Sequence, residues 1–305
     1  MSINVRPLIV ESNLRVIKAF EKTYTEIANN LSKSLSYNHN PEFTVITIYL
    51  IYKYLDHKFE ELRADIQNTV NDETDYLYYL GYGIGLMSFY DSTGTSYTVK
   101  SVLKEVPSLV DRETLVQIKN VTMADLLQVT RNTELSIKQF IRDTMTKHLN
   151  IRNLQNMGRE DLYKKLISDL NGTKLQQAVK DNMIAIVDKA GRRWKVDNYV
   201  EMVARTKAQE IVTDGMKEYV NNNDGHGDLA RIPVNPATVD ACLDFEGLII
   251  SMTGATEGYK TYAELKRTNL IFHPSCRHTP IPYHSYNDIP ADVLNRHEKV
   301  SKGLE

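Results

Sequence analysis

HPSCRHTPIP, residues 273–282, contains one of the two cysteines of this chain, two histidines and three prolines. The other cysteine is Cys242, which lies in the upstream segment NPATVDACLDFEG (residues 235–247), just before the apolar run 248–250. The prolines restrict the backbone to turn and extended conformations. The two cysteine-centred segments bracket a loop, and we expect them to belong to one small folded module.

Four side chains in these segments are candidate ligands for a metal ion. They are two thiols and two imidazoles: Cys242, His273, Cys276 and His278. Their number and softness are those that a tetrahedral structural zinc prefers. The spacing H-x-x-C-x-H requires a loop that folds back on itself, and Cys242 stands alone. The residues therefore indicate a structural zinc site as one hypothesis.

Two other arrangements account for the same residues. Pro274 and the later prolines can form a rigid turn in which Cys276 is a small buried apolar side chain near Cys242, with Arg277 binding carbonyl groups or the nearby acidic helix. A disulfide between the two cysteines is the third arrangement, which a reducing cytoplasm disfavours.

Composition limits the class of protein. The chain has 305 residues, 42% of them hydrophobic, and a formal net charge of −2. It can fill a core, and it has no overall attraction for nucleic acid, so contact with DNA would need a local patch such as Arg192, Arg193 and Lys195. The N-terminus lacks the layout of a signal peptide, so we expect no export. The longest apolar run, 43–55, is shorter than the roughly 20 residues of a membrane helix, so we expect no stable membrane insertion.

The first half of the chain is predicted to be helical. An apolar stripe at three- and four-residue steps comprises Leu14, Ile17, Phe20, Tyr24 and Ile27. Further helices are expected over 43–66, ending near 68–71, and over 75–90, 122–149 and 159–170. We interpret residues 1–150 as a helical docking or extension region.

The second half changes character after one more long helix. That helix is expected from Val196 to Val220, with Asp197 as its N-cap, and it closes a helical spine over 151–222. Strands are expected at 229–234 and 248–252. Between them we expect a short helix with Asn235 as its N-cap and Pro236 at its first position, which carries Cys242 and stops at Gly247. Residues 223–285 form a small α+β module, here called the C-terminal module, and 286–305 form a tail. The predicted fold class is α+β, predominantly α-helical.

A third segment completes a pattern that resembles a known family. GRRW at 191–194 carries the only tryptophan, Trp194, and is followed by the pair Arg205-Thr206. Next come Cys242 with an acidic residue and Gly247, and then the HPxCRH turn with Pro274 and Arg277. In this order the pieces resemble the Mu F-like minor capsid and head morphogenesis proteins of tailed phages, over residues 185–285. Many family members have CRC where this chain has Cys276-Arg277-His278.

The resemblance implies a minor capsid protein of a tailed phage or prophage, associated with the portal vertex during procapsid assembly. It implies the portal protein and the major capsid or scaffolding protein as partners, with packaged DNA as a further candidate. It also implies location in the virion head, and in the host cytoplasm during assembly. The alternatives are a DNA-associated protein ejected with the genome and, less favoured, a zinc-dependent enzyme.

The sequence lacks the motifs that a zinc-dependent enzyme or another common class of enzyme would need. The sequence has no H-x-E with P-C-x-x-C, no H-E-x-x-H and no G-x-S-x-G. Gly81, Gly83 and Gly85 lack the G-x-G-x-x-G spacing of a dinucleotide site, and close helix packing explains them better. We therefore predict a protein without catalytic residues.

Overall fold

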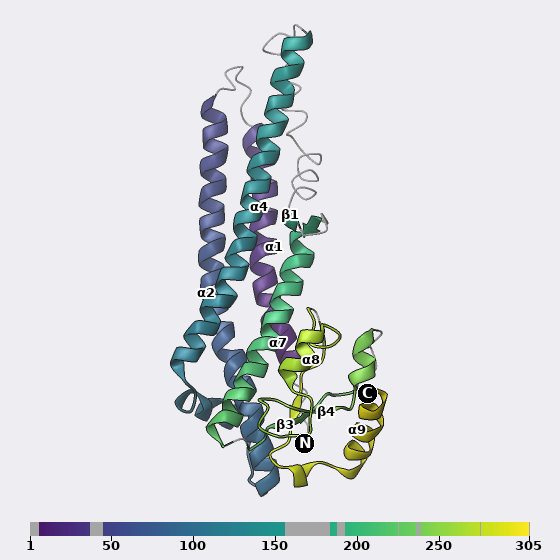
Figure 1. Ribbon diagram of the computed structural model, residues 1–305. Coiled ribbons are helices and arrows are strands. Elements are labelled where there is room, and N and C mark those ends of the chain that lie inside the picture. The colour runs from purple at the N-terminus through teal and green to yellow at the C-terminus, as the bar shows by residue number, and fades with distance from the viewer. Residues whose placement is uncertain are drawn as a thin grey trace. The chain divides into compact units, whose positions relative to one another are not determined.

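The computed structural model describes residues 6–36, 45–155, 184–187, 193–224, 226–235, 238, 240–274 and 276–304. Helices dominate these residues, with a small three-stranded antiparallel sheet, so the predicted fold class is confirmed (Figure 1). The helices are α1 (Arg6–Ser36), α2 (Val45–Thr93), α3 (Val99–Glu105), η1 (Val106–Ser108), α4 (Arg112–Gln155), α7 (Val196–Asn222), η2 (Ala241–Phe245), α8 (Tyr262–Thr268), η3 (Tyr286–Asp288) and α9 (Ala291–Gly303). The strands are β1 (Ile184–Val187), β2 (Arg193–Lys195), β3 (Leu229–Arg231), β4 (Ile249–Ser251) and β5 (Ile281–Pro282).

The chain forms two compact units. Unit 1 comprises Met1–Asn13, Asn71–Val121 and Met202–Glu305, and unit 2 comprises Leu14–Val70 and Thr122–Glu201. The long helices α1, α2, α4 and α7 each contribute residues to both units. The division of the chain into segments 1–150, 151–222, 223–285 and 286–305 stays a prediction.

Helix α2 differs from the prediction, because it is one continuous helix where two were expected. It passes without a break through residues 68–71, where the asparagines suggested an end. Asparagine disfavours a helix interior by less than about 1 kcal/mol, a preference that tertiary packing overrides. Ile66 and Val70 are buried on this stretch, and so are Glu73 and Thr74 just after it. Burial on both sides of the expected break therefore keeps the segment helical.

Close contact between α2 and α7 organises unit 1. A Cβ atom added at Gly81 would lie 2.0 Å from the carbonyl oxygen of Val212, and one added at Gly215 would lie 2.3 Å from the carbonyl oxygen of Tyr78. The two backbones therefore approach more closely than any side chain would permit. The prediction of close helix packing is confirmed at Gly81 and at Gly85, where an added Cβ would lie 2.3 Å from the Tyr219 ring, whereas Gly83 has its nearest neighbour, Val102, at 3.2 Å.

The core of unit 1 draws on both halves of the sequence. Buried apolar side chains from α2, α4 and α7 pack with those of the C-terminal module: Leu77, Tyr78, Leu80, Leu115, Ile211, Val212, Met216, Ile232, Cys242, Phe245, Ile250, Leu265, Ile271 and Cys276. Both cysteines belong to this cluster. The module therefore completes its core with residues that lie more than a hundred positions earlier in the chain.

The predicted strands at 229–234 and 248–252 are present as the shorter strands β3 and β4. The sheet order is β4-β3-β5, all antiparallel, with Ala230 opposite both Ile250 and Pro282. Pro282 on the edge strand β5 has no N–H, and its carbonyl oxygen accepts a hydrogen bond from Ser88 Oγ at 3.3 Å. This edge therefore offers little to an added strand.

A buried carboxylate organises the loop that follows β4. Asp228 is 2% exposed and accepts hydrogen bonds from Ser251 Oγ at 2.6 Å, from the backbone and hydroxyl of Thr253 at 2.8 Å, and from Thr256 N at 3.0 Å. Burial alone would raise the pKa of Asp228, but the hydrogen bonds from Ser251 and Thr253 outweigh it and hold this pKa below its usual range. The charged form is thus the one that the fold accommodates.

We expect Asp228→Asn to lower the free energy of unfolding by about 3 kcal/mol at neutral pH, because an amide NH₂ would face groups that are themselves donors. The folded pKa is depressed, so this stabilisation is present above the unfolded pKa of about 3.9 and is lost as pH falls through the folded pKa. Urea unfolding of both proteins at pH 7 and near pH 3 measures the difference and its decline. The exposed Asp244→Asn is the control; equal midpoints for Asp228→Asn and wild type would contradict the role.

The short helix around Cys242 begins later than predicted. Asn235 is not its N-cap: η2 is a 3₁₀ helix that starts at Ala241, and the side chain of Asp240 accepts the N–H of Cys242 at 3.1 Å. Asp240 supplies the cap that was assigned to Asn235, whose own N–H is directed to Glu246 Oε1 at 3.0 Å. Pro236 lies outside the described residues. The predicted end at Gly247 agrees with its φ of +93°.

Unit 2 is built from α1, the first part of α2 and α4. Three residues of the predicted stripe on α1, Phe20, Tyr24 and Ile27, are buried, while Ile17 is half-buried and Val16 is buried in its place. The side chain of Leu14 lies outside those that the structure describes. Helix α4 starts at Arg112, earlier than the predicted 122, because the Asp111 carboxylate accepts the N–H groups of Glu113 and Thr114. The expected helix 159–170 lies outside the described residues. Helix α7 begins at Val196, so Asp197 falls inside its first turn.

None of the helices in the described part of the chain is both long enough and apolar enough to cross a membrane.

Candidate functional site

Two local structures bring the cysteines together. Cys242 sits in the first turn of η2, which Asp240 caps. His273 and Cys276 lie in the loop after α8. The N-terminus of this helix is stabilised by a capping box between Thr261 and Glu264. The loop reverses direction through positive φ values at Asn269 (57°) and Phe272 (55°). The N–H of Cys276 then bonds to the carbonyl of His273 at 2.9 Å, which is the fold-back that the H-x-x-C spacing requires.

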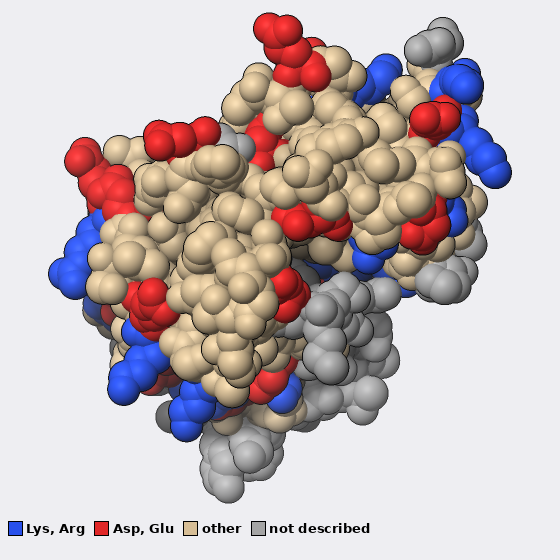
Figure 2. All heavy atoms as spheres, turned by 90° about the horizontal axis from the view of Figure 1, so that it is seen from below, with Lys and Arg blue, Asp and Glu red and all other residues tan. Residues whose placement is uncertain are grey.

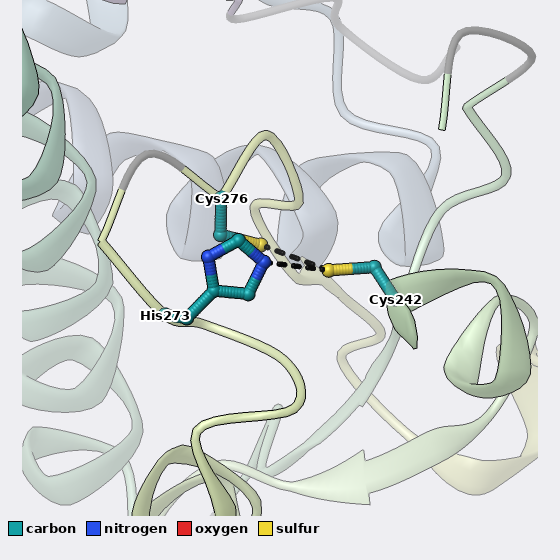
Figure 3. Close-up of side chains that lie close together, drawn as sticks. All are labelled: Cys242, His273 and Cys276. Carbon is teal, nitrogen blue, oxygen red and sulfur yellow. Dashed lines mark hydrogen bonds between the residues drawn. The ribbon is translucent and has the colours of Figure 1, made fainter. Parts of the chain in front are cut away.

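The side chains of Cys242, His273 and Cys276 converge on one point (Figure 3). Cys242 Sγ lies 3.7 Å from Cys276 Sγ and 3.2 Å from His273 Nε2, and all three ligand atoms lie within 4.8 Å of one another. Both cysteines are free thiols and both are buried. The expectation that the two cysteine segments approach each other is confirmed.

The Cys242–Cys276 distance of 3.7 Å is close to that in a tetrahedral metal site, and the Cys242–His273 distance of 3.2 Å is somewhat shorter. With Zn–S bonds of about 2.3 Å and Zn–N bonds of about 2.0 Å, two thiolates lie about 3.8 Å apart, and a thiolate and an imidazole nitrogen about 3.5 Å apart. Cys242, His273 and Cys276 therefore could hold a soft divalent ion with little movement. The same distances also fit weak thiol hydrogen bonds in a packed turn.

His278 lies next to this group of three residues. Its Nδ1 is 3.6 Å from Cys276 Sγ, and its Nε2 is 2.9 Å from Glu246 Oε1 and 3.4 Å from Thr238 Oγ1. Both His278 and Glu246 are 3% exposed. The sequence prediction missed Glu246, although the acidic residue before Gly247 was already part of the pattern that the family resemblance used.

The titration of these groups reflects burial and close charges. Burial, followed by the proximity of Cys276, raises the pKa of the Cys242 thiol. Burial acts in the same direction on Cys276, but hydrogen bonding to His278 outweighs it and lowers this pKa below the usual range. Burial would lower the pKa of His278, yet its hydrogen bonds to Cys276 and Glu246 raise that pKa. The shifts at Cys276 and His278 depend on each other, because each group is hydrogen-bonded to the other.

The other residues singled out by the sequence are structural or lie outside this cluster. The carbonyl oxygen of Pro274 is 2.8 Å from His273 Nδ1, so it orients the imidazole. Thr206 Oγ1 donates to the carbonyl of Met202 at 2.7 Å within α7, and the adjacent Arg205 is half-buried on the same helix. Arg277 is exposed.

Gly247 marks a close approach between η2 and α9. A Cβ added there would lie 2.4 Å from Arg296 Nε, which donates to the carbonyl oxygen of Glu246 at 3.2 Å. Arg296 thereby fixes the backbone of the residue that contacts His278. The side chain of Trp194 is not among those that the structure describes.

Most of the candidate basic patch lies outside the described residues. Arg192 and the side chain of Arg193 lie outside the described residues, and Lys195 is exposed. On the face in Figure 2, acidic side chains are scattered among uncharged residues and basic side chains gather toward the edges, with no continuous basic area.

Comparison with known proteins identifies the family. The family described as phage minor capsid protein 2 matches residues 98–301, which include α4, α7 and the whole Cys/His cluster. No curated protein and no solved structure matches the chain. The match extends well beyond residues 185–285, which carried the resemblance in the sequence, and covers more than half of the chain. The prediction of a phage minor capsid family is thus confirmed, and the chain belongs to the phage minor capsid protein 2 family.

Proposed function

We propose that this protein is a minor structural component of a tailed-phage or prophage head that joins the procapsid near the portal vertex. Membership of a minor capsid family is the observation that carries this proposal. Assembly takes place in the host cytoplasm, and the protein then resides in the head. Its partners are the portal protein and the major capsid or scaffolding protein, and its role is structural rather than catalytic.

We propose further that residues 1–150 provide the docking contacts. Large apolar side chains stand exposed on helices of this region: Tyr49 is 57% exposed and Leu50 56% on α2, and Leu135 is 66% exposed on α4. Aromatic and apolar side chains of this kind are the usual anchors of protein interfaces. The rival surface is the C-terminal module, where Val234, Leu243 and Leu270 are each 50% exposed.

Two triple variants separate these surfaces. We expect Tyr49→Ser/Leu50→Ser/Leu135→Ser to weaken binding to the portal or capsid partner by roughly a hundredfold, since three interface side chains contribute about 1 kcal/mol each. The matched variant Val234→Ser/Leu243→Ser/Leu270→Ser should bind as wild type. Co-expression with the neighbouring head proteins, the portal first, followed by purification of procapsids, measures incorporation.

Both variants alter exposed positions, so each should change the unfolding free energy by only about 0.5 kcal/mol per site. Loss of incorporation in the second variant alone would move docking to the C-terminal module. Normal incorporation of both variants would contradict docking through either surface. Failure of the wild-type protein to co-purify with any head protein would overturn the capsid role itself.

We also propose that Cys242, His273, Cys276 and His278 hold a structural zinc. The convergence of the Cys242, His273 and Cys276 ligand atoms within 4.8 Å of one another supports three of these ligands, and Nδ1 of His278 lies 3.6 Å from Cys276 Sγ. Such an ion would tie η2 to the loop after α8 and stabilise the C-terminal module. Contact with packaged DNA stays a prediction, which the salt dependence of binding to duplex DNA would test.

A further inference from the structure

In each imidazole of the cluster, one ring nitrogen lies within hydrogen-bond distance of an oxygen acceptor. His273 Nδ1 is 2.8 Å from the carbonyl oxygen of Pro274, and His278 Nε2 is 2.9 Å from Glu246 Oε1. A carbonyl oxygen can only accept, so Nδ1 of His273 carries the proton and Nε2 presents its lone pair toward Cys242. Metal-binding histidines almost always donate their second N–H to a carboxylate or carbonyl in this way.

In His278 the roles of the two ring nitrogens are exchanged. The carboxylate of Glu246 accepts from Nε2, so the nitrogen that faces Cys276 is Nδ1, 3.6 Å from its sulfur. That distance is the edge expected between a thiolate and an imidazole nitrogen on one tetrahedral ion, about 3.5 Å. Nδ1 of His278 is therefore directed toward Cys276 with the proton on the far nitrogen, although it is not among the three ligand atoms that lie within 4.8 Å of one another.

Glu246 is itself held rigidly. It is 3% exposed, its Oε1 also accepts the N–H of Asn235 at 3.0 Å, and its own carbonyl oxygen accepts from Arg296 Nε at 3.2 Å. A buried carboxylate is costly unless it is hydrogen-bonded, and these contacts meet that requirement.

Asp240 is the competing carboxylate. Its Oδ2 lies 3.6 Å from His273 Nε2, beyond hydrogen-bond distance, and its side chain is 54% exposed. Its Oδ1 is already used to cap η2 through Cys242 N. An exposed capping carboxylate is therefore a weaker candidate for the fourth ligand than a buried imidazole.

We propose that Glu246 is a positioning residue of the metal site: it accepts a hydrogen bond from Nε2–H of His278 and so leaves Nδ1 to approach the ion as the fourth ligand, beside Cys242, His273 and Cys276. This inference rests on the proposed zinc site and adds to it a residue that does not touch the ion. Removing such a partner typically weakens metal binding by about 10- to 100-fold.

The test compares Glu246→Met with Glu246→Gln in the full-length protein. Methionine keeps the side-chain volume but has no oxygen to accept the hydrogen bond from His278. The affinity for Co²⁺, measured against a competing chelator, should therefore fall about 10- to 100-fold. Glutamine can still accept through its amide oxygen and should restore most of the affinity. The visible absorption of tetrahedral Co²⁺ should change in Glu246→Met and persist in Glu246→Gln.

A His278→Gln background separates positioning from general stability. If Glu246 acts through His278, Glu246→Met should cause no further loss of affinity there. A similar further loss would mean a purely structural role and would overturn the assignment. Thermal unfolding of each variant in excess chelator confirms that the metal-free proteins fold. Asp244→Asn, exposed on the same turn, is the matched control and should bind Co²⁺ as wild type.

Two further outcomes would overturn the inference. Wild-type affinity in Glu246→Met would remove Glu246 from the site, and loss of affinity in Asp240→Asn instead would transfer the fourth position to Asp240. Wild-type protein that takes up no Co²⁺ or Zn²⁺ would remove the metal site itself. Procapsid incorporation is measured separately, so the capsid role would stand or fall on its own.

Discussion

Gly81→Ala is expected to lower the free energy of unfolding of unit 1 by about 3 kcal/mol or more. The added methyl carbon would lie 2.0 Å from the carbonyl oxygen of Val212 and 2.8 Å from its carbonyl carbon. Neither atom can rotate away, so α2 and α7 would have to separate and unpack the core around Tyr78 and Met216. Alanine favours a helix by about 1 kcal/mol over glycine, which offsets only part of the loss from overpacking.

Two other helical glycines provide matched controls. At Gly83 the nearest atom to an added Cβ is a side-chain carbon of Val102 at 3.2 Å, which can yield by a small shift, so Gly83→Ala should change stability by about 1 kcal/mol or less. At Gly303 nothing lies within 4 Å, so Gly303→Ala should be neutral or slightly stabilising. Thermal and urea unfolding give the ranking. A Gly81→Ala protein as stable as Gly83→Ala would contradict the close approach.

Cys276→Ser is expected to lose the bound metal and, with it, at least about 3 kcal/mol of stability in the C-terminal module. The reason is that a serine hydroxyl stays protonated at neutral pH and cannot replace a thiolate ligand. Wild-type protein purified without chelator should contain close to one equivalent of zinc per chain. Metal analysis and thermal unfolding, each with and without chelator, make the measurement.

The chelator distinguishes the metal site from a packed turn. If zinc is bound, chelator should lower the stability of the wild type to near that of Cys276→Ser and leave the variant unchanged. Cys276→Ala is the control for lost packing, because it removes the thiol but stays apolar. Metal-free wild-type protein that unfolds identically with and without chelator would leave only the buried turn.

The two proposals for this protein concern different parts of the chain. The exposed apolar side chains on α2 and α4 belong to unit 2, whereas the Cys/His cluster belongs to unit 1. Docking and metal binding can therefore be disrupted independently by point substitutions. A zinc-free variant that folds but still enters procapsids would indicate that the ion serves stability alone.

Much of the local structure followed from the sequence. Apolar residues at helical spacing predicted α1 and α7, the short apolar segments after residue 228 predicted β3 and β4, and the glycine series on α2 predicted a close helix contact. The chemistry of two cysteines beside two histidines also predicted that these segments meet. Each of these features depends on neighbours within a few positions, or on residue types too rare in this chain to be placed by chance.

Only the tertiary structure decided the rest. Residues 68–71 are helical because Ile66, Val70 and Thr74 are buried, and no local pattern reports that burial. Glu246 and His278 are 32 residues apart, and neither residue type by itself predicts a buried pair. Their contact exists because η2 and the loop after α8 share one core with residues of α2 and α7. Long-range packing of this kind determines which acceptor faces His278, and so which of its nitrogens is left for a metal.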